Sequence, residues 1–260
     1  DWERLSGNPN AIHLLEKKEN FDKIDWERLS ENPNAIRLLE NNPRKIDWLN
    51  LSGNPNAIRL LEKTENYDKI EWWNLSGNPS AINLLENNPR KITWYELSSN
   101  PNAIGLLEKK ENYDKIDWKV LSGNPNAIRL LEKTENYDKI DWEVLSGNPN
   151  AIRLLEKTEN YDKIEWWNLS GNPSAINLLE NNPRKITWYE LSSNPNAIGL
   201  LEKKENYDKI ANLSLNHNAI QLLKHIDWDD WDDYMTKIDW DDLSRNPSIF
   251  QLNTRDIYNN

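Results

Sequence analysis

Arginine at one recurring position is the first feature of this chain that could do chemistry. The phrase Ala-Ile-x-Leu-Leu recurs along the sequence, and x is arginine at Arg37, Arg59, Arg129 and Arg153. Some helical-repeat proteins read RNA with one set of side chains per repeat, so these arginines are candidate nucleic-acid contacts. The position also points away from the apolar Ile and Leu, and a solvated helix face is the simpler interpretation.

Metal binding is the second chemistry to consider, because five aspartates crowd one short segment. They are Asp227, Asp229, Asp230, Asp232 and Asp233. Hard cations such as Ca²⁺ take carboxylate oxygens, but the segment lacks the spacing and the distal Glu of a calcium loop. Trp228, Trp231 and Tyr234 follow at helical spacing, which favours a helix with an aromatic stripe over a metal site.

The histidines and the known catalytic motifs offer no third site. His13, His217 and His225 are the only histidines, and the nearest two are eight positions apart. That spacing is about two helical turns, too far for one metal ion without a further ligand. The sequence contains no Gly-rich phosphate loop and no nucleophile motif. We therefore predict a non-enzymatic protein without a cofactor.

The balance of charge argues against polyanionic partners. The chain carries 43 acidic and 32 basic side chains, a formal charge of -11. Its average surface therefore repels nucleic acid and anionic membranes. No apolar run is long enough to span a bilayer, and a chain without cysteine suits a reducing compartment.

A tandem repeat organises the whole chain. Nine units headed by tryptophan read Trp-x-x-Leu-Ser-x-Asn-Pro-(Asn/Ser)-Ala-Ile-x-Leu-Leu-Glu. Long units span 24 residues, as from Trp48 to Trp72, and short units span 22. In a short unit, a proline such as Pro43 takes the place that Tyr67 has in a long unit, three residues before an Ile.

Part of the array is a duplicated block. The 72 residues from Lys45 to Ile116 recur at Lys139 to Ile210, with changes only at Leu49, which becomes Glu143, and at the residue after it. Arrays that copy whole blocks change length without rebuilding a unique site, which is typical of repeat scaffolds.

Each unit is predicted to form two short α-helices. Asn54 is an N-cap followed by Pro at the first helical position, and we expect a helix of about nine residues from there. A shorter helix begins at each Trp, with Asp47, Glu71 or Thr93 as its cap, and Gly53 helps to end it. Helices this short are marginal alone and must stack. The predicted fold is therefore all-α, an α-solenoid of tandem 22/24-residue two-helix repeats.

Apolar spacing predicts which side chains are buried and which are exposed. The buried set of a long unit should comprise Tyr67, Ile70, Trp72, Leu75, Ala81, Ile82, Leu84 and Leu85. Four further aromatics directly follow a core Trp: Trp73, Tyr95, Trp167 and Tyr189. Adjacent helix residues cannot share a face. These four are either protein-binding anchors along a groove or part of the packing between helices.

We divide the chain into two regions. Residues 1–211 form the array of nine units, and residues 212–260 are predicted to be degenerate C-terminal capping repeats, because the Trp is lost and His217 stands where Pro is expected. Asp1 opens inside a repeat, so we expect upstream sequence and an open apolar end. Such an end would permit head-to-tail self-association.

The repeated phrase carries a family resemblance. Leu29 to Glu40, followed by Lys45 to Trp48, reads L-S-x-N-P-N-A-I-x-L-L-E and K-I-D-W. It resembles a short Asn-rich helical repeat found in proteins of giant DNA viruses of amoebae and algae. The resemblance covers almost the whole chain and implies a viral protein, placed in the host cell or the virion. It assigns no functional residue.

Two functions follow from these observations. The leading hypothesis is a non-enzymatic scaffold for protein–protein interaction or assembly, with a protein partner or a second copy of the chain on its repetitive surface. The alternative is a modular nucleic-acid-binding array that uses the four arginines, against the acidic average charge.

Overall fold

The structure, a computed structural model, describes residues 1–225, 238–246 and 248. The described residues form helices and no strand. Consecutive repeats pack on one another as in an α-solenoid, so the predicted fold class is confirmed. The chain separates into two compact units, Asp1–Leu130 and Leu131–Asn260. The division at residue 211 concerns the repeat pattern and stays a prediction.

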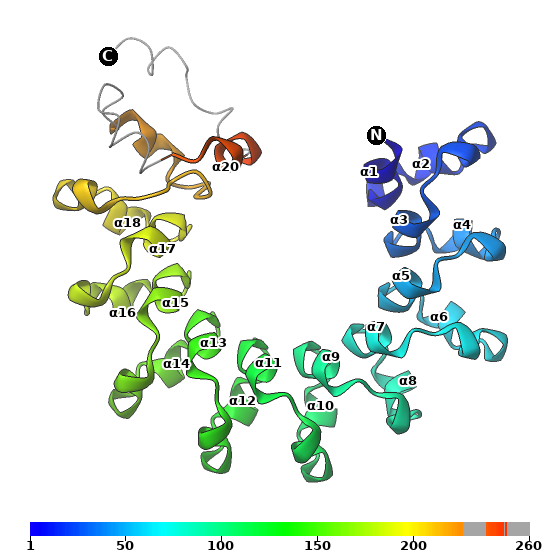
Figure 1. Cartoon of the computed structure of the whole chain (residues 1–260), viewed down its shortest axis with the longest axis horizontal. Helices are drawn as coiled ribbons and strands as arrows, with labels where there is room; N and C mark the ends of the chain where they lie inside the picture. The colour runs from blue at the N-terminus through cyan, green and yellow to red at the C-terminus, as the bar shows by residue number, and fades with distance from the viewer. Residues whose placement is uncertain (226–237, 247, 249–260) are drawn as a thin grey trace. The chain divides into compact units, whose positions relative to one another are not determined.

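Each repeat opens with a six-residue α-helix that begins at the repeat's Trp. These first helices are α1 (Trp2–Gly7), α3 (Trp26–Glu31), α5 (Trp48–Gly53), α7 (Trp72–Gly77), α9 (Trp94–Ser99), α11 (Trp118–Gly123), α13 (Trp142–Gly147), α15 (Trp166–Gly171), α17 (Trp188–Ser193) and, later, α20 (Trp240–Arg245). Within each unit the first helices of neighbouring repeats pack side by side. In each unit they form a row (Figure 1).

A second, shorter α-helix of four or five residues follows in each repeat. These helices are α2 (Ile12–Leu15), α4 (Ile36–Glu40), α6 (Ile58–Leu61), α8 (Ile82–Glu86), α10 (Ile104–Leu107), α12 (Ile128–Leu131), α14 (Ile152–Leu155), α16 (Ile176–Glu180) and α18 (Ile198–Leu201). Within each unit they form a second row beside the first (Figure 1).

The repeats close with 3-10 helices. Long repeats have a six-residue one: η2 (Lys18–Lys23), η4 (Thr64–Lys69), η6 (Lys110–Lys115), η7 (Thr134–Lys139), η8 (Thr158–Lys163) and η10 (Lys204–Lys209). Short repeats have three residues: η3 (Pro43–Lys45), η5 (Pro89–Lys91) and η9 (Pro183–Lys185). Two others, η1 (Pro9–Ala11) and η11 (Ile220–His225), lie outside this pattern.

The predicted nine-residue helix is wrong in length. α5 ends at Gly53, and Asn54 leaves it with extended backbone at φ -75° and ψ 116°. The Asn54 side chain then accepts a hydrogen bond from the amide of Asn56 at 3.0 Å, and this turn delays the second helix until Ile58. Asn54 caps a turn instead of a helix, because the residues after it do not enter an α-helix before Ile58.

The predicted caps of the first helices are correct at only one of three positions. The Asp47 carboxylate accepts from the amide of Asn50 at 2.9 Å, whereas Glu71 and Thr93 make no side-chain cap. No described glycine has a positive φ, so the helices end without a left-handed residue. Gly53 therefore terminates α5 through no special backbone conformation.

The core is smaller and more polar than the apolar pattern predicts. Ile70, Leu75, Ala81, Leu84 and Leu85 are buried as expected. Tyr67, Trp72 and Ile82 are only half-buried. A serine and an asparagine of each repeat after the first are buried in their place, as with Ser76 and Asn78.

A buried polar ladder holds neighbouring repeats in register. The Nδ2 of Asn78 donates to the carbonyl oxygens of Ser52 and Asn54 in the preceding repeat, both at 3.0 Å. The last carbonyls of a helix have no partner within it. Each asparagine therefore pairs with a free carbonyl at the end of the first helix of the preceding repeat. The same bonds recur from Asn32 to Asn216.

The serine of each repeat forms the second rung of the ladder. Ser76 donates to the carbonyl of Trp72 at 2.7 Å and accepts from the amide of Thr93, the residue that begins the next repeat, at 2.9 Å. Ser214 and Asn246 continue the pattern beyond the nine regular units, since Ser214 accepts from the amide of Asp239 and its carbonyl accepts from Asn246, both at 2.8 Å. We call these serines and asparagines the polar ladder.

Candidate binding surfaces

Three exposed apolar side chains lie at the same position, directly after the Trp, on three neighbouring helices. Leu49 of α5, Trp73 of α7 and Tyr95 of α9 are 39%, 47% and 58% exposed. α5 packs on α7, and α7 packs on α9. We call these three residues, two aromatic and one aliphatic, the aromatic row. An exposed patch of this kind on a soluble protein is a candidate interaction surface.

The duplicated block carries part of this row into the second unit. Trp167 of α15 is 45% exposed and Tyr189 of α17 is 59% exposed, and the two helices pack on each other. Of the two interpretations of these aromatics, their exposure favours a surface role, because packing alone would cover them. The sequence left a surface role and a packing role open, and the structure leaves all four side chains exposed.

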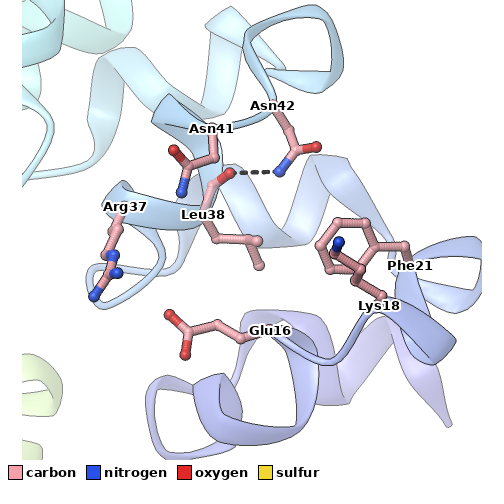
Figure 2. Close-up of a pocket in the computed structure, with 7 residues that line it drawn as sticks. All are labelled: Glu16, Lys18, Phe21, Arg37, Leu38, Asn41 and Asn42. Atoms are coloured by element: carbon pink, nitrogen blue, oxygen red, sulfur yellow. Dashed lines mark hydrogen bonds between the residues drawn. The ribbon is translucent and has the colours of Figure 1, made fainter.

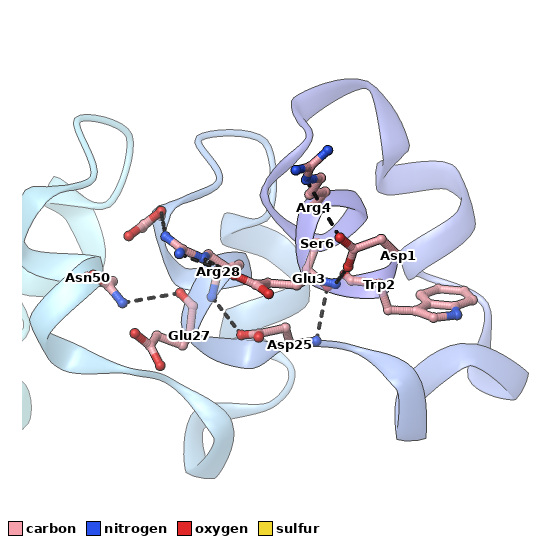
Figure 3. A network of polar contacts seen from close by, with 10 residues as sticks. Asp1, Trp2, Glu3, Arg4, Ser6, Asp25, Glu27, Arg28 and Asn50 are labelled. Carbon is pink, nitrogen blue, oxygen red and sulfur yellow. Dashed lines mark hydrogen bonds and ion pairs between the residues drawn. The ribbon is translucent and has the colours of Figure 1, made fainter. Parts of the chain in front are cut away.

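Polar side chains tie the first helices together beside the row. The Arg28 guanidinium lies 3.3 Å from a Glu3 carboxylate oxygen of the preceding repeat and 3.4 Å from Glu31 (Figure 3). In the next repeat the Asn50 side chain donates to the Glu27 carbonyl at 3.4 Å. Asn74 donates to the Leu49 carbonyl at 2.7 Å. The position occupied by the row is thus acidic, at Glu3 and Glu27, in the repeats before it.

The four candidate arginines lie on the other row of helices. Arg37, Arg59, Arg129 and Arg153 are all exposed, on α4, α6, α12 and α14. Asn83 of α8 and Gly105 of α10 occupy the same position between Arg59 and Arg129. None of the four makes an ion pair with a described carboxylate. The structure therefore does not bring arginines and exposed aromatics together on one surface.

Metal-binding residues do not converge in the described part of the chain. No group of three or more His, Asp or Glu side chains there could hold an ion. His13 and His217 are exposed. The aspartates from Asp227 to Asp233 lie outside the described residues, as does the side chain of His225. Among the described helices, none has the length and apolar character needed to cross a membrane.

A lysine covers the half-buried Trp at the head of most repeats. The Nζ of Lys69 lies 4.8 Å from the centre of the Trp48 ring, and Lys163 lies 4.7 Å from Trp142. The other pairs are Lys23 with Trp2, Lys91 with Trp72, Lys115 with Trp94, Lys185 with Trp166 and Lys209 with Trp188. A cation over an indole face is attracted by the ring. These lysines thus close each repeat onto its own first helix.

A second aromatic ring meets the Trp wherever the preceding repeat is long. Tyr67 contacts Trp72 edge-on with ring centres 6.0 Å apart, and Tyr137 contacts Trp142 at 6.1 Å. Such edge-to-face pairs are favourable beyond their burial. The other pairs are Phe21 with Trp26, Tyr113 with Trp118 and Tyr161 with Trp166.

A hollow takes the place of the second ring at two junctions where the preceding repeat is short. Trp48, Trp94 and Trp188 follow short repeats and have no aromatic partner among the described residues. Beside Trp48 lies a cavity of about 220 Å³ lined by Glu40, Pro43, Ile46, Trp48, Leu60, Lys63, Glu65, Asn66 and Lys69. The cavity beside Trp188 has about 310 Å³ and the corresponding lining. We call these spaces the junction hollows.

A different recess lies where a long repeat is followed by a short one. Its volume is about 420 Å³, and it is lined by Glu16, Lys18, Phe21, Arg37, Leu38, Asn41 and Asn42. Figure 2 shows Phe21 and Leu38 on its walls and the bond from Asn42 to the Leu38 carbonyl, 2.8 Å long. Its side chains carry both signs of charge. Arg37 borders this recess, but no second candidate arginine does.

Comparison with known proteins adds no relative. No protein-family model, no curated protein and no solved structure matches the chain.

The polar ladder and the junction hollows were missed by reasoning from the sequence. The signal for the ladder is the Leu-Ser-x-Asn phrase, since these two polar residues do not vary while exposed positions do. The signal for the hollows is the exchange of Tyr67 for Pro43, which removes a ring from the surface of the next repeat. Both signals lie in residue exchanges between repeats and not in a motif.

Proposed function

We propose that this protein is a non-enzymatic scaffold that binds a protein partner through the aromatic row. The observation that carries the proposal is the alignment of Leu49, Trp73 and Tyr95 on three packed helices, with all three exposed. Trp and Tyr are over-represented among residues that dominate binding energy in protein interfaces. The polar ladder supports the proposal because it holds these helices, and hence the row, in one register.

The partner's chemistry follows from the row and its surroundings. An apolar strip must be met by apolar side chains, and the carboxylate of Glu27, at the same position on the neighbouring α3, favours a basic residue at that end of the partner's rim. The formal charge of -11 favours a basic partner too. A second copy of this acidic chain is a weaker candidate, since like charges repel.

Substitutions that the array itself uses at this position provide the test. Trp73→Glu and Tyr95→Lys place on α7 and α9 the residues found at Glu27 and Lys119, so the fold is preserved. Immobilised wild-type chain and this double variant are compared for capture of partner proteins, with cross-linking to locate the contact. The proposal expects capture by the wild type, contact at the row and at least tenfold weaker binding by the variant.

A matched pair of arginine substitutions separates the alternative function. Arg59→Asn and Arg129→Asn introduce the residue present at Asn83, on the other row of helices. Partner binding should be unchanged. The nucleic-acid alternative would instead be established if this variant lost binding and the wild type bound nucleic acid at low salt, where phosphate contacts are strongest. Light scattering across concentrations tests self-association in the same preparations.

A further inference from the structure

We propose that the junction hollows bind tyrosine side chains of a partner protein. The inference rests on the proposed function, because the occupant belongs to a protein, but it uses residues on a different part of each repeat from the aromatic row. It is carried by a comparison within the chain, where one site is seen both empty and filled.

Two repeats that are nearly identical in sequence make this comparison. Leu51 to Ile70 and Leu145 to Ile164 have the same twenty residues in the same order. They differ at the two residues before this stretch and in the end of the previous repeat, where Pro43 stands in one case and Tyr137 in the other. Differences among the side chains around this place therefore compare the site with and without a tyrosine.

Three side chains hold the tyrosine in the filled site. The Tyr137 ring meets Trp142 edge-on at 6.1 Å. Lys157 donates to the Tyr137 hydroxyl at 3.2 Å, and this bond raises the pKa of Lys157 above its ordinary value. Lys163 lies 5.6 Å from the centre of the Tyr137 ring while it also covers Trp142. The site thus recognises both the ring and its hydroxyl.

The same three side chains surround the empty hollow. Trp48, Lys63 and Lys69 correspond to Trp142, Lys157 and Lys163 and line the cavity together. Without a tyrosine, Lys63 lies 3.8 Å from the Glu40 carboxylate, and Lys69 donates to Asn66 Oδ1 at 3.3 Å. In the filled repeat the equivalent Asn160 Oδ1 is buried without a partner. The lysines therefore exchange internal partners for the tyrosine.

Burial shows what the missing ring leaves open. Leu60 and Asn66 of the hollow are 5% and 6% exposed, whereas Leu154 and Asn160 beneath Tyr137 are 0% exposed. A ring placed in the hollow would cover this remaining apolar surface, which is favourable in proportion to the area removed from water.

The empty arrangement recurs at each junction after a short repeat. At Trp94, Lys109 pairs with Glu86 at 3.3 Å and Lys115 donates to Asn112 at 3.2 Å. At Trp188, Lys203 pairs with Glu180 at 3.7 Å and Lys209 donates to Asn206 at 3.0 Å in the same way. Because the site is repeated, a peptide chain with several tyrosines can occupy more than one site at once. Its affinity then exceeds that of a free small molecule with one ring.

The repeat spacing sets the distance between those tyrosines. The hollow at Trp48 and the equivalent place at Trp94 are two repeats apart, and packed helices lie about 8–10 Å apart. The rings should therefore be about 20 Å apart. An extended chain advances about 3.3 Å per residue, so the partner segment should carry tyrosines about six residues apart.

The first experiment uses p-cresol, the side chain of tyrosine, as the ligand of the 260-residue chain. The indole N–H signals of the tryptophans are followed by NMR during titration. The signals of Trp48, Trp94 and Trp188 should shift saturably, while those of Trp72, Trp142 and Trp166, which already have a tyrosine, should not. Equal shifts at both sets, or no saturable shift at the first set, would overturn the proposal.

Reciprocal variants keep the test decisive. Pro43→Tyr supplies the ring from within and should abolish the Trp48 shift while the Trp94 shift remains. Tyr137→Ala empties the filled site described above and should make the Trp142 signal respond to p-cresol. A Trp48 response that persists in Pro43→Tyr would contradict the assignment of the site. Circular dichroism confirms that both variants are folded.

Synthetic peptides extend the test to a protein ligand. A peptide with two tyrosines six residues apart should bind at least about tenfold more tightly than one with a single tyrosine. The triple variant Pro43→Tyr, Pro89→Tyr and Pro183→Tyr should lose this binding. The Trp73→Glu and Tyr95→Lys variant should retain it. Loss in the row variant alone would support the aromatic row and refute the hollows, so the two proposals fail separately.

Discussion

The polar ladder and the aromatic row lie within two turns of each other on the same helices, yet they vary in opposite ways. On α7, Ser76 is fully buried and its hydroxyl makes two hydrogen bonds to the backbone. Trp73 is 47% exposed, and no hydrogen bond of its side chain is seen. From repeat to repeat the serine is kept, whereas the position of Trp73 holds Glu27, Leu49 or Tyr95 in its neighbours. Within each repeat, the constant ladder positions hold the array together, and the variable row position is free to serve binding.

The physical reason is the backbone of very short helices. A six-residue helix leaves most of its terminal N–H and C=O groups without partners inside the helix. Apolar packing between repeats is non-directional, whereas the ladder supplies directed bonds at those ends. Substitutions in the ladder should therefore act on stability, and those in the row on binding.

The largest effect is expected from Asn78→Ala. It removes two buried hydrogen bonds and leaves the carbonyl of Ser52 unpaired, which should lower the free energy of unfolding by about 2–4 kcal/mol. Urea denaturation followed by circular dichroism measures it. Because each repeat contacts only its neighbours, the loss should also broaden the transition or split it in two.

Asn83→Ala is the matched control for this prediction. Asn83 is exposed on α8 and its side chain has no bond in the structure, so the change should stay within about 0.5 kcal/mol. Equal destabilisation by the two substitutions would mean that the ladder does not organise the array.

A smaller loss is expected from Ser76→Ala. The amide of Thr93 then lacks its buried acceptor, at a cost of about 1–2 kcal/mol. The exposed Ser80, whose hydroxyl makes no hydrogen bond in the structure, serves as the comparison, and Ser80→Ala should be close to neutral. Thermal melting of both variants decides whether burial of the hydroxyl sets the difference.

The fold was predictable to the extent that apolar spacing and local capping determine it. The positions of Leu75, Leu84 and Leu85 predict the buried face, and Asp47 predicts a helix start. The second helix was predicted too long, because Asn54 can cap either a helix or a turn. Asn8 makes no bond to a preceding repeat, yet it caps the same turn and its second helix also begins four residues later. The choice is therefore local, and the capping rule does not distinguish the two outcomes.

The candidate surfaces were predictable only where they depend on a helix face. Trp73 and Tyr95 must be exposed because Trp72 and Trp94 occupy the inner side of the same helices. The junction hollow depends instead on a ring that is missing from one repeat and on lysines from the next. Such a site has no motif, and it becomes visible only when two repeats are compared in space.

A gain of stability is expected from Ser80→Asn. At the equivalent position Asn102 donates to the Pro79 carbonyl of the preceding repeat at 2.9 Å, and Asn56 makes the same bond to Pro33. Asparagine at position 80 should reach the Pro55 carbonyl and add about 0.5 kcal/mol, since the bond is exposed. Unchanged or lower stability in urea denaturation would mean that only the buried bonds between repeats stabilise the array.

The smallest effect on stability is expected at the row itself. Tyr95 is 58% exposed and Lys119 occupies its position on α11, so Tyr95→Lys should change the free energy of unfolding by less than about 0.5 kcal/mol. Urea denaturation measures the change beside partner binding by the same preparation. A loss above 1 kcal/mol would show that the ring is part of the packing, and the row would then belong with the ladder. A neutral change with lost binding would instead establish that the two regions divide structure from function.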